Sequence, residues 1–152
     1  GDPRVRQWLG GTSDRAASDA MLDRINLHIA EHGWGLWALE RKADHRLIGF
    51  TGLAEVKAGA LPVGPAVEMG WRLSPDAWGG GFATEAAQAA LAWGLAHIDT
   101  DEIIAFTAAT NLKSQAVMTR IGMKADPSRD FDHPRLAPNN QKQHHKKYTI
   151  HR

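Results

Sequence analysis

The spacing of apolar residues along the chain indicates alternating helices and strands. Apolar side chains recur every three or four residues where a helix is expected, and at every second residue where a strand is expected. Ser13 or Asp14 can cap the first helix, and Gly33 can end it. In chain order the pattern predicts a helix over 13–32, strands over 34–40, 47–56 and 67–73, a helix over 82–97, a strand over 103–107, a helix over 111–121 and a strand over 148–151, with a Gly/Pro-rich loop over 57–65 and an irregular segment over 124–147.

This order of elements predicts a mixed α/β sheet. Short loops join the first three strands, so these strands should pair antiparallel. The strand–helix–strand unit over 67–107 should be a right-handed crossover between parallel neighbours. Open α/β sheets bind ligands beyond the carboxyl ends of their strands, which directs attention to the segment after residue 73.

Composition narrows the class of protein. The 152 residues suffice for one domain with its own core. A formal net charge of +1 argues against a broad nucleic-acid surface, and the absence of cysteine excludes disulfides and a thiol nucleophile. We find no apolar run of about 18 residues and no signal peptide. We therefore expect a cytoplasmic protein with neither a membrane nor a nucleic-acid partner.

The most informative run is Trp78-Gly79-Gly80-Gly81-Phe82-Ala83-Thr84-Glu85-Ala86. Three glycines lie between a strand and an alanine-rich helix, where the backbone can turn tightly and a ligand can approach it. The first turn of a helix also carries unpaired N–H groups and a partial positive charge, which suit a phosphate group. A dinucleotide site fits poorly, because its glycines are spaced as Gly-x-Gly-x-x-Gly and follow the first strand of the fold. A plain strand-to-helix turn is the alternative.

Three ordered motifs resemble the GNAT superfamily of acyl-CoA-dependent N-acetyltransferases, and within it the RimJ/RimL-like branch. Val67-Glu68-Met69-Gly70-Trp71-Arg72-Leu73 is similar to the fourth strand of that fold, and the run from Trp78 to Ala86 to its pyrophosphate loop. Asn111-Leu112-Lys113-Ser114 with Ile121-Gly122-Met123 is similar to its Asn-x-x-Ser…Gly-aromatic helix. The resemblance implies a GNAT-like fold: a mostly antiparallel sheet with a central, splayed parallel pair flanked by helices.

The chain departs from the family pattern in two places. The strand and helix that normally open the fold are absent, so we expect a single domain over 1–152 that is incomplete at its N-terminus. A sheet without its first strand has an exposed edge, through which a homodimer could form. Met118 stands where many members carry a tyrosine that protonates the leaving thiolate.

The resemblance implies a set of cofactor-binding residues and no metal. A backbone bulge near Arg72 and Leu73 would expose an N–H group that polarises the thioester carbonyl. Asn111 would bond to the pantetheine arm, although Asn is also a good helix cap. The expected set is Arg72, Leu73, Gly79, Gly80, Gly81, Phe82, Ala83, Thr84, Asn111 and Ser114.

Acyl transfer to an amine also needs a base, because an ammonium ion cannot attack until it loses a proton. Glu68 is the first candidate, and its alternative is a structural or surface carboxylate. Glu55 and His133 are weaker candidates. Ser114 is a candidate donor to the cofactor sulfur. His28 and His32 have i, i+4 spacing, but no Glu joins them as in a His-Glu-x-x-His metal motif, which favours a surface pair.

We therefore expect an enzyme that transfers an acetyl group from acetyl-CoA to a primary amine by direct attack. The acceptor within this branch would be a protein N-terminal amine or, alternatively, a small amine such as a polyamine or aminoglycoside. A non-catalytic acyl-CoA-binding module is the rival of a different class, and an interaction domain that uses the exposed sheet edge is a third.

Overall fold

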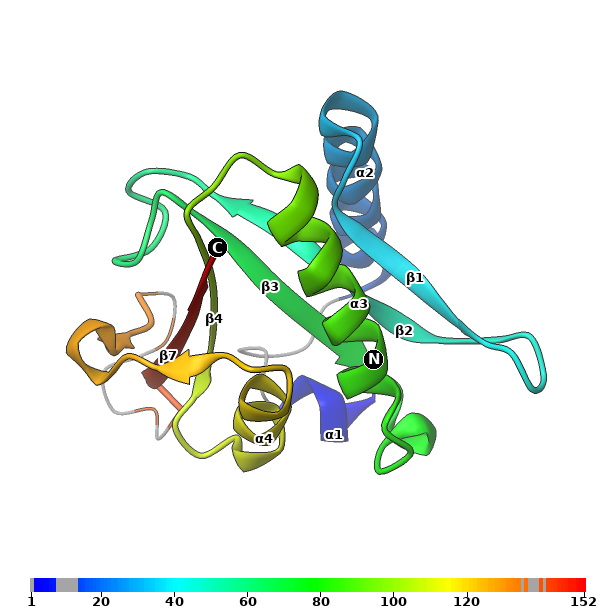
Figure 1. The fold of residues 1–152 in the computed structure, drawn as a ribbon. Coiled ribbons are helices and arrows are strands. Elements are labelled where there is room, and N and C mark those ends of the chain that lie inside the picture. The colour runs from blue at the N-terminus through cyan, green and yellow to red at the C-terminus, as the bar shows by residue number, and fades with distance from the viewer. Residues whose placement is uncertain (1, 8–13, 135, 137–139, 141) are drawn as a thin grey trace.

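A seven-stranded sheet forms the centre of the molecule (Figure 1). The computed structural model describes residues 2–7, 14–134, 136, 140 and 142–152. The helices are α1 (Pro3–Arg6), α2 (Arg15–His32), α3 (Phe82–His97) and α4 (Leu112–Arg120), with single 3₁₀ turns η1 (Pro75–Ala77) and η2 (Pro127–Arg129). The strands are β1 (Leu36–Arg41), β2 (Arg46–Val56), β3 (Ala66–Leu73), β4 (Glu102–Ala108), β5 (Lys124–Ala125), β6 (Phe131–Asp132) and β7 (His144–His151).

The strands follow the spatial order β1-β2-β3-β4-β7-β5, and β6 also pairs with β7. Every pairing is antiparallel except that between β3 and β4, which lie side by side near the middle of the sheet. The predicted fold class, a mostly antiparallel sheet with one central parallel pair and flanking helices, is therefore confirmed. Among the described residues, no strand precedes Leu36.

Helix α3 crosses one face of the sheet and supplies much of the core (Figure 1). It begins at Phe82 and ends at His97, as the sequence predicts. A Cβ atom at Gly94 would lie 2.5 Å from a methyl carbon of Leu53, so this glycine lets the helix approach β2 closely. Buried residues of the main core come from both layers: Leu53, Met69, Ala87, Ala90, Leu91, Ile103, Ala105, Val117 and Met118.

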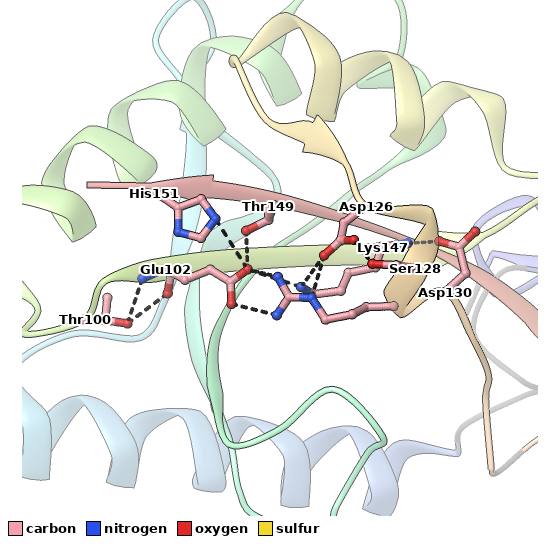
Figure 2. A network of polar contacts seen from close by, with 9 residues as sticks. Thr100, Glu102, Asp126, Ser128, Asp130, Lys147, Thr149 and His151 are labelled. Atoms are coloured by element: carbon pink, nitrogen blue, oxygen red, sulfur yellow. Dashed lines mark hydrogen bonds and ion pairs between the residues drawn. The ribbon is translucent and has the colours of Figure 1, made fainter.

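Helix α2 lies on the opposite face of the sheet from α3 and α4 (Figure 2). Asp14 caps it, since its carboxylate accepts a 2.7 Å hydrogen bond from the Ala17 N–H, whereas the alternative cap Ser13 lies outside the described residues. Gly33 ends it in the left-handed conformation, at φ 76°. None of its residues is buried, and Leu22 and Leu27 are 52% and 59% exposed. Of the apolar residues spaced along one face of this helix, Met21, Ile25 and Ile29 are half-buried and Ala17 and Leu22 are exposed, so the face is only partly covered within the described chain.

The C-terminal segment differs from the prediction. Residues 124–147 were expected to be irregular, but they contain β5, β6 and the first half of β7, which begins at His144 rather than at Tyr148. The polar residues of β7 form a full ladder with β4. Pattern reasoning missed the first half of this strand because its buried side chains, those of His145 and Lys147, are polar or charged.

Among the described residues, no helix combines the length and apolar character needed to cross a bilayer.

Candidate active site

The parallel strands β3 and β4 part after a short contact. They pair only at Val67 with Ile103 and at Glu68 with Ile104. On its other side β3 stays paired with β2 as far as Leu73. Beyond Glu68, β3 forms no further ladder with β4 among the described residues. An extended ligand could hydrogen-bond to backbone groups of β3 along this stretch.

The expected bulge in β3 is absent. Gly49, Phe50 and Thr51 of β2 pair one-to-one with Leu73, Arg72 and Trp71. Gly49 of β2 accommodates the close approach of β3 at this end of the strand. A Cβ atom at Gly49 would lie 2.1 Å from the carbonyl oxygen of Arg72. β3 and β4 therefore diverge without an extra residue in β3.

The triple glycine forms a loop that leads directly into α3. Gly79 and Gly81 adopt left-handed backbone conformations, with φ 79° and 81°, and a Cβ atom at either would meet no atom within 4 Å. Gly81 is the N-cap of α3 and supplies no side-chain hydrogen bond. The N–H groups of the first turn, at Phe82, Ala83 and Thr84, thus have no intrahelical acceptor. All three glycines are exposed, so an anion can reach these groups.

Glu68 lies where the two strands part. Its neighbours Val67 and Met69 pack into the core beneath α3, so its side chain lies on the opposite face of the sheet. No hydrogen bond or ion pair joins its carboxylate to a described residue. Burial raises the pKa of the Glu68 carboxyl to about 7. A carboxylate with a pKa near neutrality can accept a proton from an ammonium ion.

Asn111 organises the start of α4. The buried side chain caps the helix by accepting a hydrogen bond from the Ser114 N–H at 3.3 Å. Its amide donates to the hydroxyl oxygens of Thr107, at 3.0 Å, and Ser114, at 3.1 Å. The capping alternative is thus observed. Because the Ser114 hydroxyl accepts this bond, its own hydrogen remains able to donate elsewhere.

The remaining candidate residues have different surroundings. Met118 is 2% exposed and belongs to the main core. Glu55 is exposed near the end of β2. His133 lies with its ring 5.0 Å from that of His145. The rings of His28 and His32 lie 4.4 Å apart, and the described residues contain no group of three side chains that could hold a metal ion.

Sequence reasoning missed a network of charged groups on β4 and β7 (Figure 2). The fully buried Lys147 lies between the carboxylates of Glu102 and Asp126, at 3.2 and 3.4 Å. Arg129 also pairs with both carboxylates, and the Thr149 hydroxyl donates to Glu102. These bonds, led by Arg129 for Glu102 and by Ser128 for Asp126, lower the pKa of each carboxyl to about 2. The sequence signal was the alternation of Lys147, Thr149 and His151 with Tyr148 and Ile150.

A second missed contact lies beside the glycine loop. The ammonium of Lys113 lies 4.6 Å from the centroid of the Trp78 ring. The Trp78 indole N–H donates to the carbonyl oxygen of Leu73 at 3.0 Å. The first turn of α4 is thus connected to the loop that begins α3.

Comparison with known proteins identifies the family. Residues 1–124 match the model of the acetyltransferase (GNAT) domain. The chain therefore belongs to the GNAT acetyltransferase family, whose members use acetyl-CoA. An uncharacterised N-acetyltransferase of Bacillus subtilis, YnaD, is 39% identical over 59 residues, which span 39% of this chain and 35% of that protein.

Solved structures share the fold. An acetyltransferase from Agrobacterium tumefaciens superposes with a TM-score of 0.76 at 25% identity, covering 99% of this chain and 80% of that one. A ribosomal-protein-S5-alanine acetyltransferase from Vibrio fischeri has a TM-score of 0.76 at 16% identity, covering 98% and 80%. A spermidine N-acetyltransferase from Vibrio cholerae, in complex with CoA and spermine, has a TM-score of 0.72 at 18% identity, covering 97% and 82%.

Proposed function

We propose that this chain transfers the acetyl group of acetyl-CoA to a primary amine. The pantetheine arm lies in the groove between β3 and β4, and the pyrophosphate binds the backbone N–H groups of residues 79–84. One observation carries this proposal above the others. Among the described residues, the ladder between β3 and β4 stops at Glu68, so β3 continues towards the glycine loop without pairing to β4.

The geometry separates the two substrates. The glycine loop leads into α3 on one face of the sheet, and Glu68 points to the other face. The cofactor therefore enters from the α3 side, and the amine approaches from the side of Glu68. The thioester of the cofactor meets the amine and Glu68 where β3 and β4 part.

Glu68 acts as the base. The acceptor arrives as an ammonium ion, and Glu68 takes its proton directly or through a water molecule. The amine nitrogen then forms a bond to the thioester carbonyl carbon, and the negative charge on the oxygen is stabilised by an N–H group near Arg72 or Leu73. The carbon–sulfur bond breaks as the tetrahedral intermediate collapses. The thiolate takes a proton from the Ser114 hydroxyl or from water, and that group takes in turn the second proton, which the positively charged nitrogen of the intermediate loses as the amide forms.

The acceptor we favour is a protein N-terminal amine. A polyamine or another small amine is the second candidate. The folds of a ribosomal-protein acetyltransferase and a spermidine acetyltransferase resemble this one about equally, and thus support both classes. A cytoplasmic location and a homodimer remain part of the same proposal.

A thiol-release assay with a panel of amines, paired with thermal shift by acetyl-CoA, tests this function. The Glu68→Gln variant should bind acetyl-CoA with unchanged affinity and lose about 100-fold in kcat, as expected when a general base is removed. Glu55→Gln, which neutralises an exposed carboxylate, is the matched control and should keep full activity.

Two outcomes would contradict the proposal in different ways. Stabilisation by acetyl-CoA without thiol release from any amine would indicate the non-catalytic binding module. No stabilisation of a folded protein would remove both the enzyme and the binding module.

A further inference from the structure

Lys113 places a positive charge beside the glycine loop. Its ammonium lies over the ring of Trp78, the residue that immediately precedes Gly79. The hydrogen bond from the indole to Leu73 fixes that ring at the end of β3. A flexible lysine is therefore held at a defined point, between the first turn of α4 and the loop that begins α3.

No carboxylate neutralises this charge within the part of the chain that the structure describes. Lys113 is exposed and makes no ion pair there. Asp76, in the turn before the loop, pairs with Arg46 at 3.3 Å. Glu85, the acidic residue of the first turn of α3, is exposed and forms no ion pair with a described residue. The ring face attracts the ammonium through a cation–π contact and leaves its positive charge in place.

We infer that Lys113 binds a phosphate group of the cofactor. This inference rests on the proposed function, which places the pyrophosphate on the adjacent loop. The ring face attracts the ammonium without taking up all three of its N–H donors, which can then bond to an anion. A lysine ammonium is a compact charge that suits a phosphate oxygen. Coenzyme A offers two sources of this chemistry, the pyrophosphate and the 3′-phosphate on its ribose.

Calorimetric titration of the wild type and of Lys113→Met tests the inference. Methionine keeps an unbranched apolar chain against Trp78 and removes only the charge. The three ligands are coenzyme A, 3′-dephospho-coenzyme A and pantetheine. We expect Lys113→Met to bind coenzyme A about tenfold more weakly, as expected for the loss of one charge-assisted bond. Its affinity for pantetheine, which carries no phosphate, should not change.

The dephosphorylated ligand identifies the source. If the variant is also weaker for 3′-dephospho-coenzyme A, Lys113 binds the pyrophosphate. If the wild type and the variant bind 3′-dephospho-coenzyme A equally well, Lys113 binds the 3′-phosphate. In either case the affinity of the wild type should fall more steeply with salt than that of the variant.

Lys42→Met, which removes an exposed charge at the β1–β2 turn, is the control and should match the wild type. An unchanged affinity of Lys113→Met for coenzyme A would overturn the inference while leaving the proposed function intact. So would an equal loss for pantetheine, which would show a packing effect. A folded wild type that binds no coenzyme A would refute both.

Discussion

Strand β4 has two very different neighbours. On one side it pairs with β7 along its whole length, from Glu102 opposite His151 to Ala108 opposite His145. On the other side it meets β3 at only two positions and then diverges. One side of β4, the closed side, is thus fully paired, and the other, the open side, is paired at its start only.

The charges follow the same division. On the closed side, the buried Lys147 and its carboxylates connect β4, β7 and η2 (Figure 2). On the open side, Glu68 has no partner among the described residues, and burial alone shifts its pKa. Paired charges hold the scaffold, whereas the unpaired carboxylate remains available for chemistry. The ladder with β7 thus fixes the position of β4, so that β3 can diverge from it.

The largest expected effect comes from breaking the closed side. Lys147→Met removes the ammonium and leaves Glu102 and Asp126 paired to Arg129, with the His151 ring 3.9 Å from Glu102. Removing one member of a buried ion pair typically costs several kcal/mol, so we expect a loss of about 3 kcal/mol in the free energy of unfolding. Urea denaturation measures it. Lys124→Met, at an exposed position of β5, should change stability by less than about 0.5 kcal/mol. Equal stabilities would show that the network does not hold β7 in place.

A smaller effect should follow from changing the glycine loop. Gly81→Ala places a side chain at a left-handed residue, which costs about 1–2 kcal/mol of stability. We expect its affinity for coenzyme A to fall about tenfold, because relief of the strain moves the first-turn N–H groups. Gly59→Ala, at φ 75° in the loop before β3, carries the same strain and should keep the affinity. Loss of affinity in both variants would indicate a general effect of stability on binding.

The smallest expected effect is the response to pH, and the two sides should respond in opposite directions. Glu68 has a folded pKa of about 7 against 4.5 unfolded, so its contribution to stability is present below about pH 4.5 and is lost as the pH rises towards 7. Glu102 and Asp126 have folded pKa values of about 2, so their contributions are present above their ordinary values and are lost as the pH falls.

Denaturation at several pH values checks this. Replacing Glu68 by Gln should remove a decline on the order of 1 kcal/mol between about pH 5 and about pH 7, a value reduced for partial solvent screening. The acid-side decline should persist in this variant. If the decline towards pH 7 is unchanged in Glu68→Gln, the raised pKa belongs to another group.

The same division explains what the sequence could predict. Helix α3 was predicted with both of its ends, because a glycine turn, an alanine-rich stretch and a following Asp-Thr-Asp are local signals. The splay of the parallel pair was expected only from the family resemblance. The bulge expected with it is absent, since β2 and β3 pair one-to-one. The divergence of β3 from β4 is a tertiary feature, and no local pattern in the sequence specifies it.

The closed side could not be predicted from local patterns. A run of His and Lys at 144–147 is typical of a solvated loop, and only the distant Glu102 and Asp126 allow Lys147 to be buried. The contact between Lys113 and Trp78 could not be predicted for the same reason. Lys113 and Trp78 lie 35 residues apart, and they meet only because α4 begins close to the loop before α3.

A calorimetric titration of the folded protein with coenzyme A shows whether the glycine loop binds this cofactor. We expect saturable binding of one coenzyme A per chain, and weaker binding by Gly81→Ala under the same conditions. The absence of any binding heat at several temperatures, with the fold verified by circular dichroism, would contradict this expectation.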